Sequence, residues 1–132
     1  MTAIYPVAIV GLFFSSPVFG HHAISTEFDP QAPVKLRGVV TKVDWTNPHA
    51  YIYVQVKDDS GNTAEWIFET AGPLGLAHNG WTRDSVRAGD EVTIFGYRSR
   101  SGLKIATARS VVLNGGQKLF AGTPYDNLPK EK

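Results

Sequence analysis

The sequence predicts an all-β domain that closes into a small barrel and contains one short helix. Three observations support this prediction. Stretches of β-branched and aromatic residues alternate with polar residues, which is the pattern of half-buried strands. Glycine and aspartate turns separate these stretches. Only one segment, which opens on Pro73 and closes at Asn79-Gly80, carries both the start and the stop signals of a helix.

Five strands are expected, and their order limits the fold. The expected strands are residues 34–44, 50–57 and 63–70, a fourth within 87–97, and 103–113, with the helix between the third and fourth strands. This order is typical of an OB-like five-stranded Greek-key barrel, with an open β-sandwich or another small barrel as the alternative. Gly38, in the middle of the first strand, is expected to mark a bulge or a bend.

The second expected strand shows which of its faces is buried. Ile52, Val54 and Val56 point to one side, and Tyr51 and Tyr53 point to the other side together with polar residues. One face of this strand therefore belongs to the core. The other face is half polar and half aromatic.

The N-terminal segment resembles a signal peptide. Residues 7–14 form an apolar run, a Ser-Ser-Pro break follows at 15–17, and Gly20 is a suitable last residue before cleavage. The run is too short to cross a bilayer of roughly 30 Å, which requires about 20 apolar residues. We therefore expect cleavage near Gly20 and a periplasmic or secreted protein without a transmembrane segment. The alternative is a buried N-terminal strand of a cytoplasmic domain.

Removal of 20 residues from the 132 leaves 112, which is the size of one domain. The expected division is a signal peptide at 1–20, an N-terminal arm at 21–33, the barrel at 34–114 and a flexible C-terminal tail at 115–132. Thirteen basic and twelve acidic residues leave the surface nearly neutral, so nucleic acid is not an expected partner. The chain has no cysteine, which excludes disulfides, thiolate metal sites and thiol catalysis.

Several short motifs follow one another in a characteristic order. They are His21-His22 after the leader, Glu27-Phe28-Asp29, Gly38-Val39-Val40, Trp45-Thr46-Asn47-Pro48-His49, Trp66 with Glu69, Gly80-Trp81, and the run from Gly89 to Gly96. In these motifs the chain resembles a family of small exported bacterial proteins of uncharacterised function, over about residues 21–120. The resemblance implies export and a small β-barrel, but no established activity. The fold also resembles that of periplasmic copper-carrying OB barrels, whose methionine-rich sites are absent here.

Four histidines are the candidate metal ligands, namely His21, His22, His49 and His78. If cleavage falls after Gly20, His21 offers both an α-amine and an imidazole, and His49 would complete a three-nitrogen brace suited to Cu(II). His22 or His78 would be substitute ligands. In the alternative interpretation the adjacent pair is simply solvated, and the ring of His49 hydrogen-bonds a carbonyl group.

Aromatic residues suggest a second kind of site. Trp45, Tyr51, Tyr53 and Trp66 are candidate ligand-binding residues, because OB barrels often bind ligands on flat rings of a sheet face. In the alternative interpretation Trp66 and Trp81 fill the barrel, while the tyrosines shield its flank.

Catalytic motifs are lacking. Glu65 and Glu69 are roughly 13 Å apart along one strand, which is too far for a shared acid–base site. The sequence has no nucleophile elbow, no phosphate-binding loop and no His-Glu-x-x-His run, so we do not expect a hydrolytic or nucleotide-using enzyme.

The leading hypothesis is an exported periplasmic binding protein of OB-like fold that holds copper or a similar transition metal. The alternative is a module that binds a small ligand or another periplasmic protein on its aromatic face. A copper oxidase built on the same brace ranks last, because 112 residues leave little room for a substrate platform.

Overall fold

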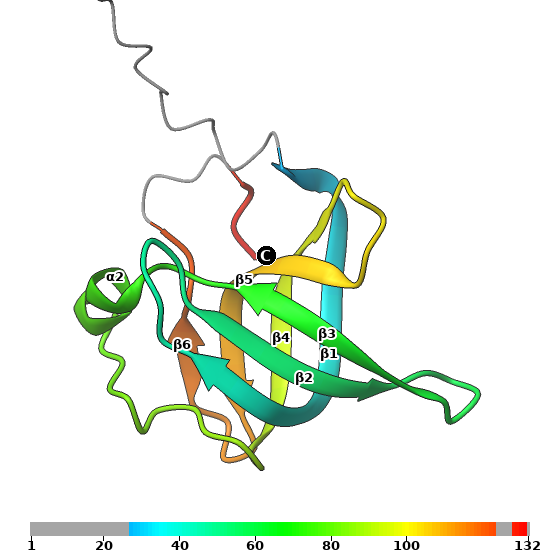
Figure 1. The fold of residues 1–132 in the computed structure, drawn as a ribbon, viewed down its shortest axis with the longest axis horizontal. Coiled ribbons are helices and arrows are strands. Elements are labelled where there is room, and N and C mark those ends of the chain that lie inside the picture. Colours follow the sequence, from blue (N-terminus) through cyan, green and yellow to red (C-terminus); the bar gives the residue numbers. More distant parts are fainter. Residues whose placement is uncertain (1–26, 124–127, 132) are drawn as a thin grey trace, which may run out of the picture.

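The computed structural model describes residues 27–123 and 128–131 of the chain (Figure 1). Its elements, in chain order, are β1 (Phe28–Asp44), β2 (Tyr51–Lys57), β3 (Thr63–Glu69), α2 (Pro73–His78), β4 (Glu91–Ser99), β5 (Ile105–Leu113) and β6 (Lys118–Phe120). No helix among the described residues is long and apolar enough to cross a membrane.

The strands form one sheet that curls into a barrel. Their order is β3-β2-β1-β4-β5-β6, and all neighbours in this order pair antiparallel. A parallel pairing of β3 with β5, from Ile67–Ile105 to Glu69–Thr107, joins the edge strand β3 to β5 and closes the barrel. Strand β1 is long enough to pair with both β2 and β4, as Figure 1 shows. The predicted OB-like barrel, with one short helix between β3 and β4, is confirmed.

The core follows the alternation seen in the sequence. Ile52, Val54 and Phe68 are buried on the inner face of the β2–β3 hairpin, and Ile94 meets them from β4. Helix α2 begins with Pro73 at its first turn and buries Leu76. The segment after the helix adds Trp81, whose indole Nε1 donates a hydrogen bond to the carbonyl oxygen of Phe120, 2.8 Å away.

Three details differ from the sequence expectation. Strand β1 begins at Phe28, so residues assigned to an N-terminal arm belong to the sheet, and residues 118–120 of the expected tail form β6. The register of β1 shifts between Val40 and Lys42 against β2 and between Phe28 and Pro33 against β4, rather than at Gly38. Gly38 has another role, because a Cβ there would lie 2.2 Å from the backbone oxygen of Gln55. Only glycine allows the two strands to approach so closely.

The last described residues pack on the barrel. Leu128 is buried in a small cluster with Phe28 and Tyr97. The Tyr97 hydroxyl donates to the carbonyl oxygen of Pro129 at 3.0 Å. The carboxylate of Glu131 accepts a hydrogen bond from Ser110 on β5 at 2.8 Å, and it pairs with the Lys118 ammonium on β6 at 2.6 Å. Residues 128–131, which we call the C-terminal segment, thus contact four strands, β1, β4, β5 and β6.

Candidate functional site

The run Trp45-Thr46-Asn47-Pro48-His49 forms the loop between β1 and β2, and it folds against the end of β3. The Thr46 hydroxyl donates to the carbonyl oxygen of His49 at 2.8 Å, and the Asn47–Pro48 peptide bond is cis. A Cβ at Gly72 would lie 2.5 Å from the carbonyl oxygen of Pro48, so glycine is needed where the loop crosses the chain after β3. The loop therefore presents His49 to the last residues of β3.

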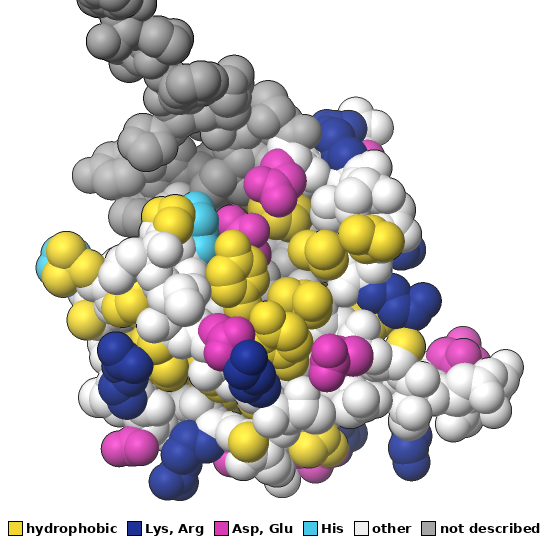
Figure 2. Space-filling view, in the orientation of Figure 1, with side chains coloured by type: hydrophobic (Ala, Val, Ile, Leu, Met, Phe, Trp, Pro, Cys, Tyr) yellow, Lys and Arg dark blue, Asp and Glu magenta, His cyan; other side chains and the backbone are white. Residues whose placement is uncertain are grey.

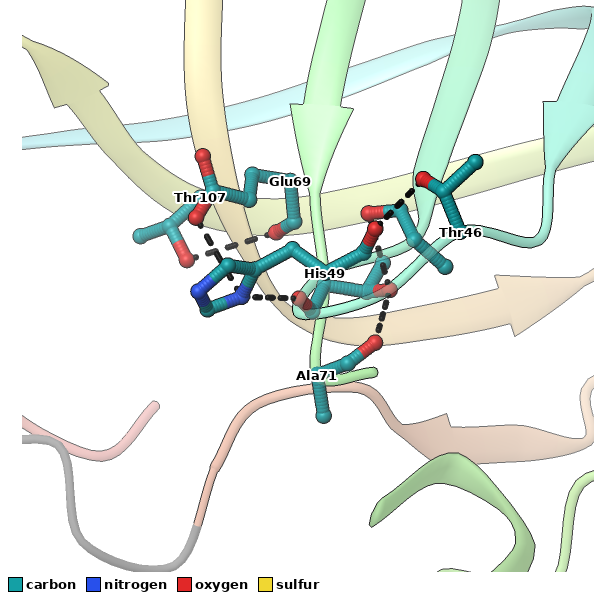
Figure 3. Close-up of polar contacts among 7 residues, drawn as sticks. Thr46, His49, Glu69, Ala71 and Thr107 are labelled. Carbon is teal, nitrogen blue, oxygen red and sulfur yellow. Dashed lines mark hydrogen bonds and ion pairs between the residues drawn. The ribbon is translucent and has the colours of Figure 1, made fainter. Parts of the chain in front are cut away.

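The imidazole of His49 is held by two acceptors on the β3 side (Figure 3). Its Nδ1 lies 3.0 Å from the carbonyl oxygen of Thr70 and 3.3 Å from Oε1 of Glu69. A carbonyl oxygen can only accept, so Nδ1 must carry the proton. In the neutral ring the lone pair then resides on Nε2, for which no polar partner is found among the described residues. The side chain is 29% exposed, so this nitrogen is a candidate ligand.

Glu69 is the buried carboxylate of the site. Its side chain is only 13% exposed. Burial raises the pKa of this carboxyl, the neighbouring His49 lowers it, and the charge of Glu27 raises it again. The Thr107 hydroxyl of β5 donates to the backbone oxygen of Glu69 at 3.4 Å, which ties this end of β3 to the neighbouring strand. An acidic group and a histidine nitrogen therefore face one another at one end of the barrel.

Tyr51 and Tyr53 lie beside this pair on the outer face of β2, as the alternation of the sequence predicts. Tyr51 is paired across the sheet with Glu69, and Tyr53 is paired with Ile67. Both tyrosines are half-buried. Burial raises the pKa of the Tyr51 hydroxyl, and the charges of Glu69 and Glu27 raise it further.

The two tryptophans assigned to the same ligand site lie elsewhere. Trp66 is 9% exposed, belongs to the core and stacks on Phe68 with ring centroids 6.2 Å apart. Trp45 meets Trp81 edge to face at 6.4 Å, and the Arg83 guanidinium lies 5.1 Å from its ring centroid. The four aromatic residues of the ligand-site hypothesis therefore do not form one surface. Tyr51 and Tyr53 alone share the outer face of β2.

The four candidate histidines are also not all assembled by the described residues. His78 is exposed in the last turn of α2. His21 and His22, and the cleavage expected near Gly20, lie outside the described residues. Within residues 27–123 and 128–131 no group of three or more His, Cys, Asp or Glu residues is placed to hold a metal ion.

Sequence reasoning missed Glu69, although a signal for it was present. Tyr51 and Tyr53 share the outer face of β2, and His49 lies two residues before Tyr51 in the loop that leads into this strand. A hairpin closed by residues 58–62 places residue 69 opposite residue 51, which is the register observed. Comparing carboxylates along β3 alone could not show this, because the partner of Glu69 is a histidine of a different loop.

The fold and this site define a small OB-like barrel with a histidine–carboxylate pair and an aromatic surface at the end of its β2–β3 hairpin. The chain belongs to the family described as "Family of unknown function (DUF6152)", whose model matches residues 10–108. A comparison with curated proteins finds no match.

Proposed function

We propose that the protein is an exported binding protein that holds copper or a similar transition metal ion through Nε2 of His49, together with His21 and His22. The observation that supports this most directly is the orientation of the His49 ring. Its Nδ1 is held by the Thr70 carbonyl and the Glu69 carboxylate. Histidines that bind metals commonly donate their second N–H to such an acceptor, which fixes the tautomer and increases the basicity of the ligating nitrogen.

The chain connection permits the histidine pair to reach this end of the barrel. Arg100 donates its backbone N–H to the carbonyl oxygen of Glu27 at 2.9 Å, and the Glu27 charge acts on both Glu69 and Tyr51. The described chain therefore begins beside the site. Glu27 is the sixth residue after His21, and such a length spans at most about 20 Å.

Nitrogen and oxygen ligands suit the ions at the upper end of the divalent affinity series, Cu(II) first. The chain supplies no cysteine, and its only methionine is Met1. Binding requires unprotonated imidazoles, and, if His21 is the first residue of the processed protein, an unprotonated α-amine as well. Affinity should therefore fall as the pH is lowered through the range of about 8 to 6.

The test is a titration of Cu(II) into the chain that begins at His21, in parallel with a chain that carries one additional residue before His21. We expect the additional residue to weaken binding at least about tenfold, because it removes the free α-amine from the chelate. Equal affinity of the two chains, or an affinity no higher than that of a free His-His peptide, would contradict the proposal.

A matched pair of variants tests the role of His49. The amide nitrogen of His49→Asn can take the place of Nδ1 and donate to the Thr70 carbonyl, but the variant has no counterpart of Nε2. His49→Gln extends instead toward the position of Nε2 with an amide, which is a poor ligand for copper. We expect both variants to fold and both to lose Cu(II) affinity. Unchanged affinity in both would remove His49 from the site.

The second candidate function is a binding module that uses the outer face of β2 and β3 for a ligand or a partner protein. It is favoured by the placement of Tyr51 and Tyr53, which lie half-buried on that face beside Ile67 rather than in the core. Flat rings on an open OB-type sheet face are suited to contact with a ligand. Titration of Tyr51→Ser with candidate ligands tests this function without altering any nitrogen of the metal proposal.

A further inference from the structure

Tyr51 lies between two carboxylate-bearing residues of the neighbouring strands. Across the sheet it is paired with Asp44 of β1 on one side and with Glu69 of β3 on the other. The charge of Glu27 also acts on Tyr51. Residues paired across a sheet have side chains on the same face, about 5 Å apart at Cβ. The Tyr51 ring is therefore an aromatic surface bordered by negative charge.

The neighbouring tyrosine shows how a cation occupies such a position in this molecule. The Lys42 ammonium lies 5.1 Å from the ring centroid of Tyr53 and 2.9 Å from Oδ2 of Asp44. A tyrosine ring and a carboxylate thus hold one cation between them, as expected for a cation–π contact supported by an ion pair. For Tyr51 no cation–π contact is found among the described residues.

The surface around the two tyrosines is apolar in the middle and acidic at its border. Figure 2 shows hydrophobic side chains gathered over the β2–β3 hairpin with acidic side chains around them. We call this surface the acidic tyrosine face. It comprises Tyr51, Tyr53, Ile67 and Ile105 with Asp44, Glu65 and Glu69, as the strand registers place them on one side of the sheet. Lys42 is its cation and already pairs with Asp44.

We propose that the acidic tyrosine face binds a basic peptide segment, with an arginine or lysine side chain over the Tyr51 ring and between the carboxylates of Asp44 and Glu69. The proposal rests on the second candidate function and names its partner. Charge complementarity selects a cation, and the half-buried apolar side chains of the face can contact the aliphatic part of a basic side chain. Along an extended peptide, alternate side chains are spaced about 6.6 Å apart, which matches the step from Tyr51 to Tyr53 on β2.

The experiment uses a hexa-arginine peptide with acetylated and amidated ends, and hexaglutamate as the probe of opposite charge. Each is titrated into the isotope-labelled chain from His21 to Lys132, and amide chemical shifts are followed by NMR. We expect only hexa-arginine to shift amides, with the shifts confined to β2 and β3 around Tyr51 and Glu69. Shifts centred elsewhere on the barrel, or equal responses to the two peptides, would overturn the proposal.

Two variants of Tyr51 test whether its aromatic ring contributes to peptide binding. Tyr51→Phe keeps the ring, and it should bind hexa-arginine about as well as the unaltered chain does. Tyr51→Ser loses the ring, and we expect its dissociation constant to rise about threefold to fivefold, which is the size of an exposed cation–π contact. Unweakened binding by Tyr51→Ser would exclude the ring as the contact.

A pair of variants with the same change in net charge tests whether peptide binding depends on charge near Tyr51 or on the net charge of the protein. Glu27→Gln and Asp59→Asn each replace an exposed carboxylate by an amide, but Asp59 lies in the turn between β2 and β3, outside the proposed contact. We expect Glu27→Gln to weaken hexa-arginine binding and Asp59→Asn to leave it unchanged. Equal weakening would show that only the net charge matters. Because both side chains are exposed, this comparison remains available even if Tyr51→Ser does not fold.

Failure of this inference is distinguishable from failure of the metal proposal. Tyr51→Ser should lose affinity for hexa-arginine and retain Cu(II) binding, because no proposed metal ligand is altered. His49→Asn should do the reverse. Loss of both activities in both variants would mean that there is one undivided site, and it would contradict a separate peptide contact at Tyr51.

Discussion

The largely buried side chain of Glu69 makes the stability of the fold depend on pH. Burial raises the pKa of the Glu69 carboxyl in the folded protein, so its neutral form favours folding relative to its ionised form. Its contribution is fully present below the unfolded pKa of about 4.3, and it is lost as the pH rises through the higher pKa of the folded state. Above the folded pKa, ionisation of Glu69 is therefore a cost to folding.

The corresponding prediction concerns Glu69→Gln. At pH 7 we expect this variant to melt at a higher temperature than the unaltered chain, and the difference should disappear near pH 4. The same variant should bind Cu(II) more weakly, because the acceptor that helps to orient His49 has lost its charge. Thermal unfolding followed by circular dichroism at both pH values checks the first part. A lower melting temperature at pH 7 would show instead that the ionised carboxylate stabilises the fold.

Gly96 gives a prediction about packing. A Cβ at this position would lie 1.6 Å from the backbone oxygen of Thr107, at the irregular step between Phe95 and Gly96 in the β4–β5 ladder. Gly96→Ala should therefore destabilise the domain by about 3 kcal/mol or more, since backbone atoms must move apart. Gly115→Ala, where nothing lies within 4 Å of the added carbon, is the matched control and should change stability little. Urea unfolding compares the two, and similar midpoints would contradict the expectation.

Residues of the site were predictable to different degrees. His49 stands out in the sequence because it is one of only four histidines, and the alternation of β2 correctly placed Tyr51 and Tyr53 outside the core. Trp66 could not be separated from them by residue type. Its position on β3 opposite Val54, which points inward, decides its burial. Pairing across strands, rather than composition, determines which aromatic rings share a face.

The C-terminal segment extends the structure beyond the five strands of the barrel. Glu131 connects Ser110 on β5 with Lys118 on β6, and Lys35 of β1 lies 3.7 Å from the same carboxylate. The hydrogen bond from Lys118, followed by that from Ser110, lowers the pKa of the Glu131 carboxyl. The segment thus adds a charged contact to the buried contact of Leu128.

Glu131→Gln tests this contact through its pH dependence. A carboxyl whose pKa is lowered by folding stabilises the protein above its unfolded pKa of about 4.3, and this contribution is lost as the pH falls through the folded pKa. The variant should therefore be less stable at pH 7 by about 1 kcal/mol or less, and it should match the unaltered chain near pH 3. Urea unfolding at the two pH values measures the difference. A constant difference at both values would point to lost packing instead of lost charge.

The order of the strands and the helix could be predicted from the sequence, whereas the residues at which they begin and end could not. Short turns that contain glycine separate β2 from β3 and β4 from β5, and these turns set the order. The first half of β1 contains Pro30 and Pro33, which argue against a central strand. They are tolerated because this half of β1 pairs only with β4. Strand β6 is three residues long, which is too short for a periodic pattern.

For the molecule as a whole, the sequence predicts the pairing of consecutive strands but not the pairing that closes the barrel. Sequential hairpins follow from short turns, whereas the β3–β5 pairing joins residues about 40 positions apart and has no local signal. This pairing contains only three residue pairs, from Ile67–Ile105 to Glu69–Thr107. The ladder between β1 and β4 is longer and reaches from Pro33 to Val39 without a register shift. The barrel is therefore closed by a short pairing, and Glu69 of the candidate site lies on it.

This difference predicts where the folded protein opens first. Local opening requires less free energy where fewer contacts and hydrogen bonds are broken, so β3–β5 should separate more readily than β1–β4. We expect the amide of Ile67, which donates to the carbonyl oxygen of Lys104 at 3.0 Å, to exchange with solvent at least about tenfold faster than the amides of the β1–β4 ladder. Hydrogen exchange of the folded protein, followed by NMR, measures both sets under the same conditions. Equal protection of the two ladders would show that the barrel opens only by global unfolding. Faster exchange at Ile67 would show that the β3–β5 pairing opens without global unfolding. A ligand that contacts Glu69 should then slow the exchange of the Ile67 amide more than that of the β1–β4 amides.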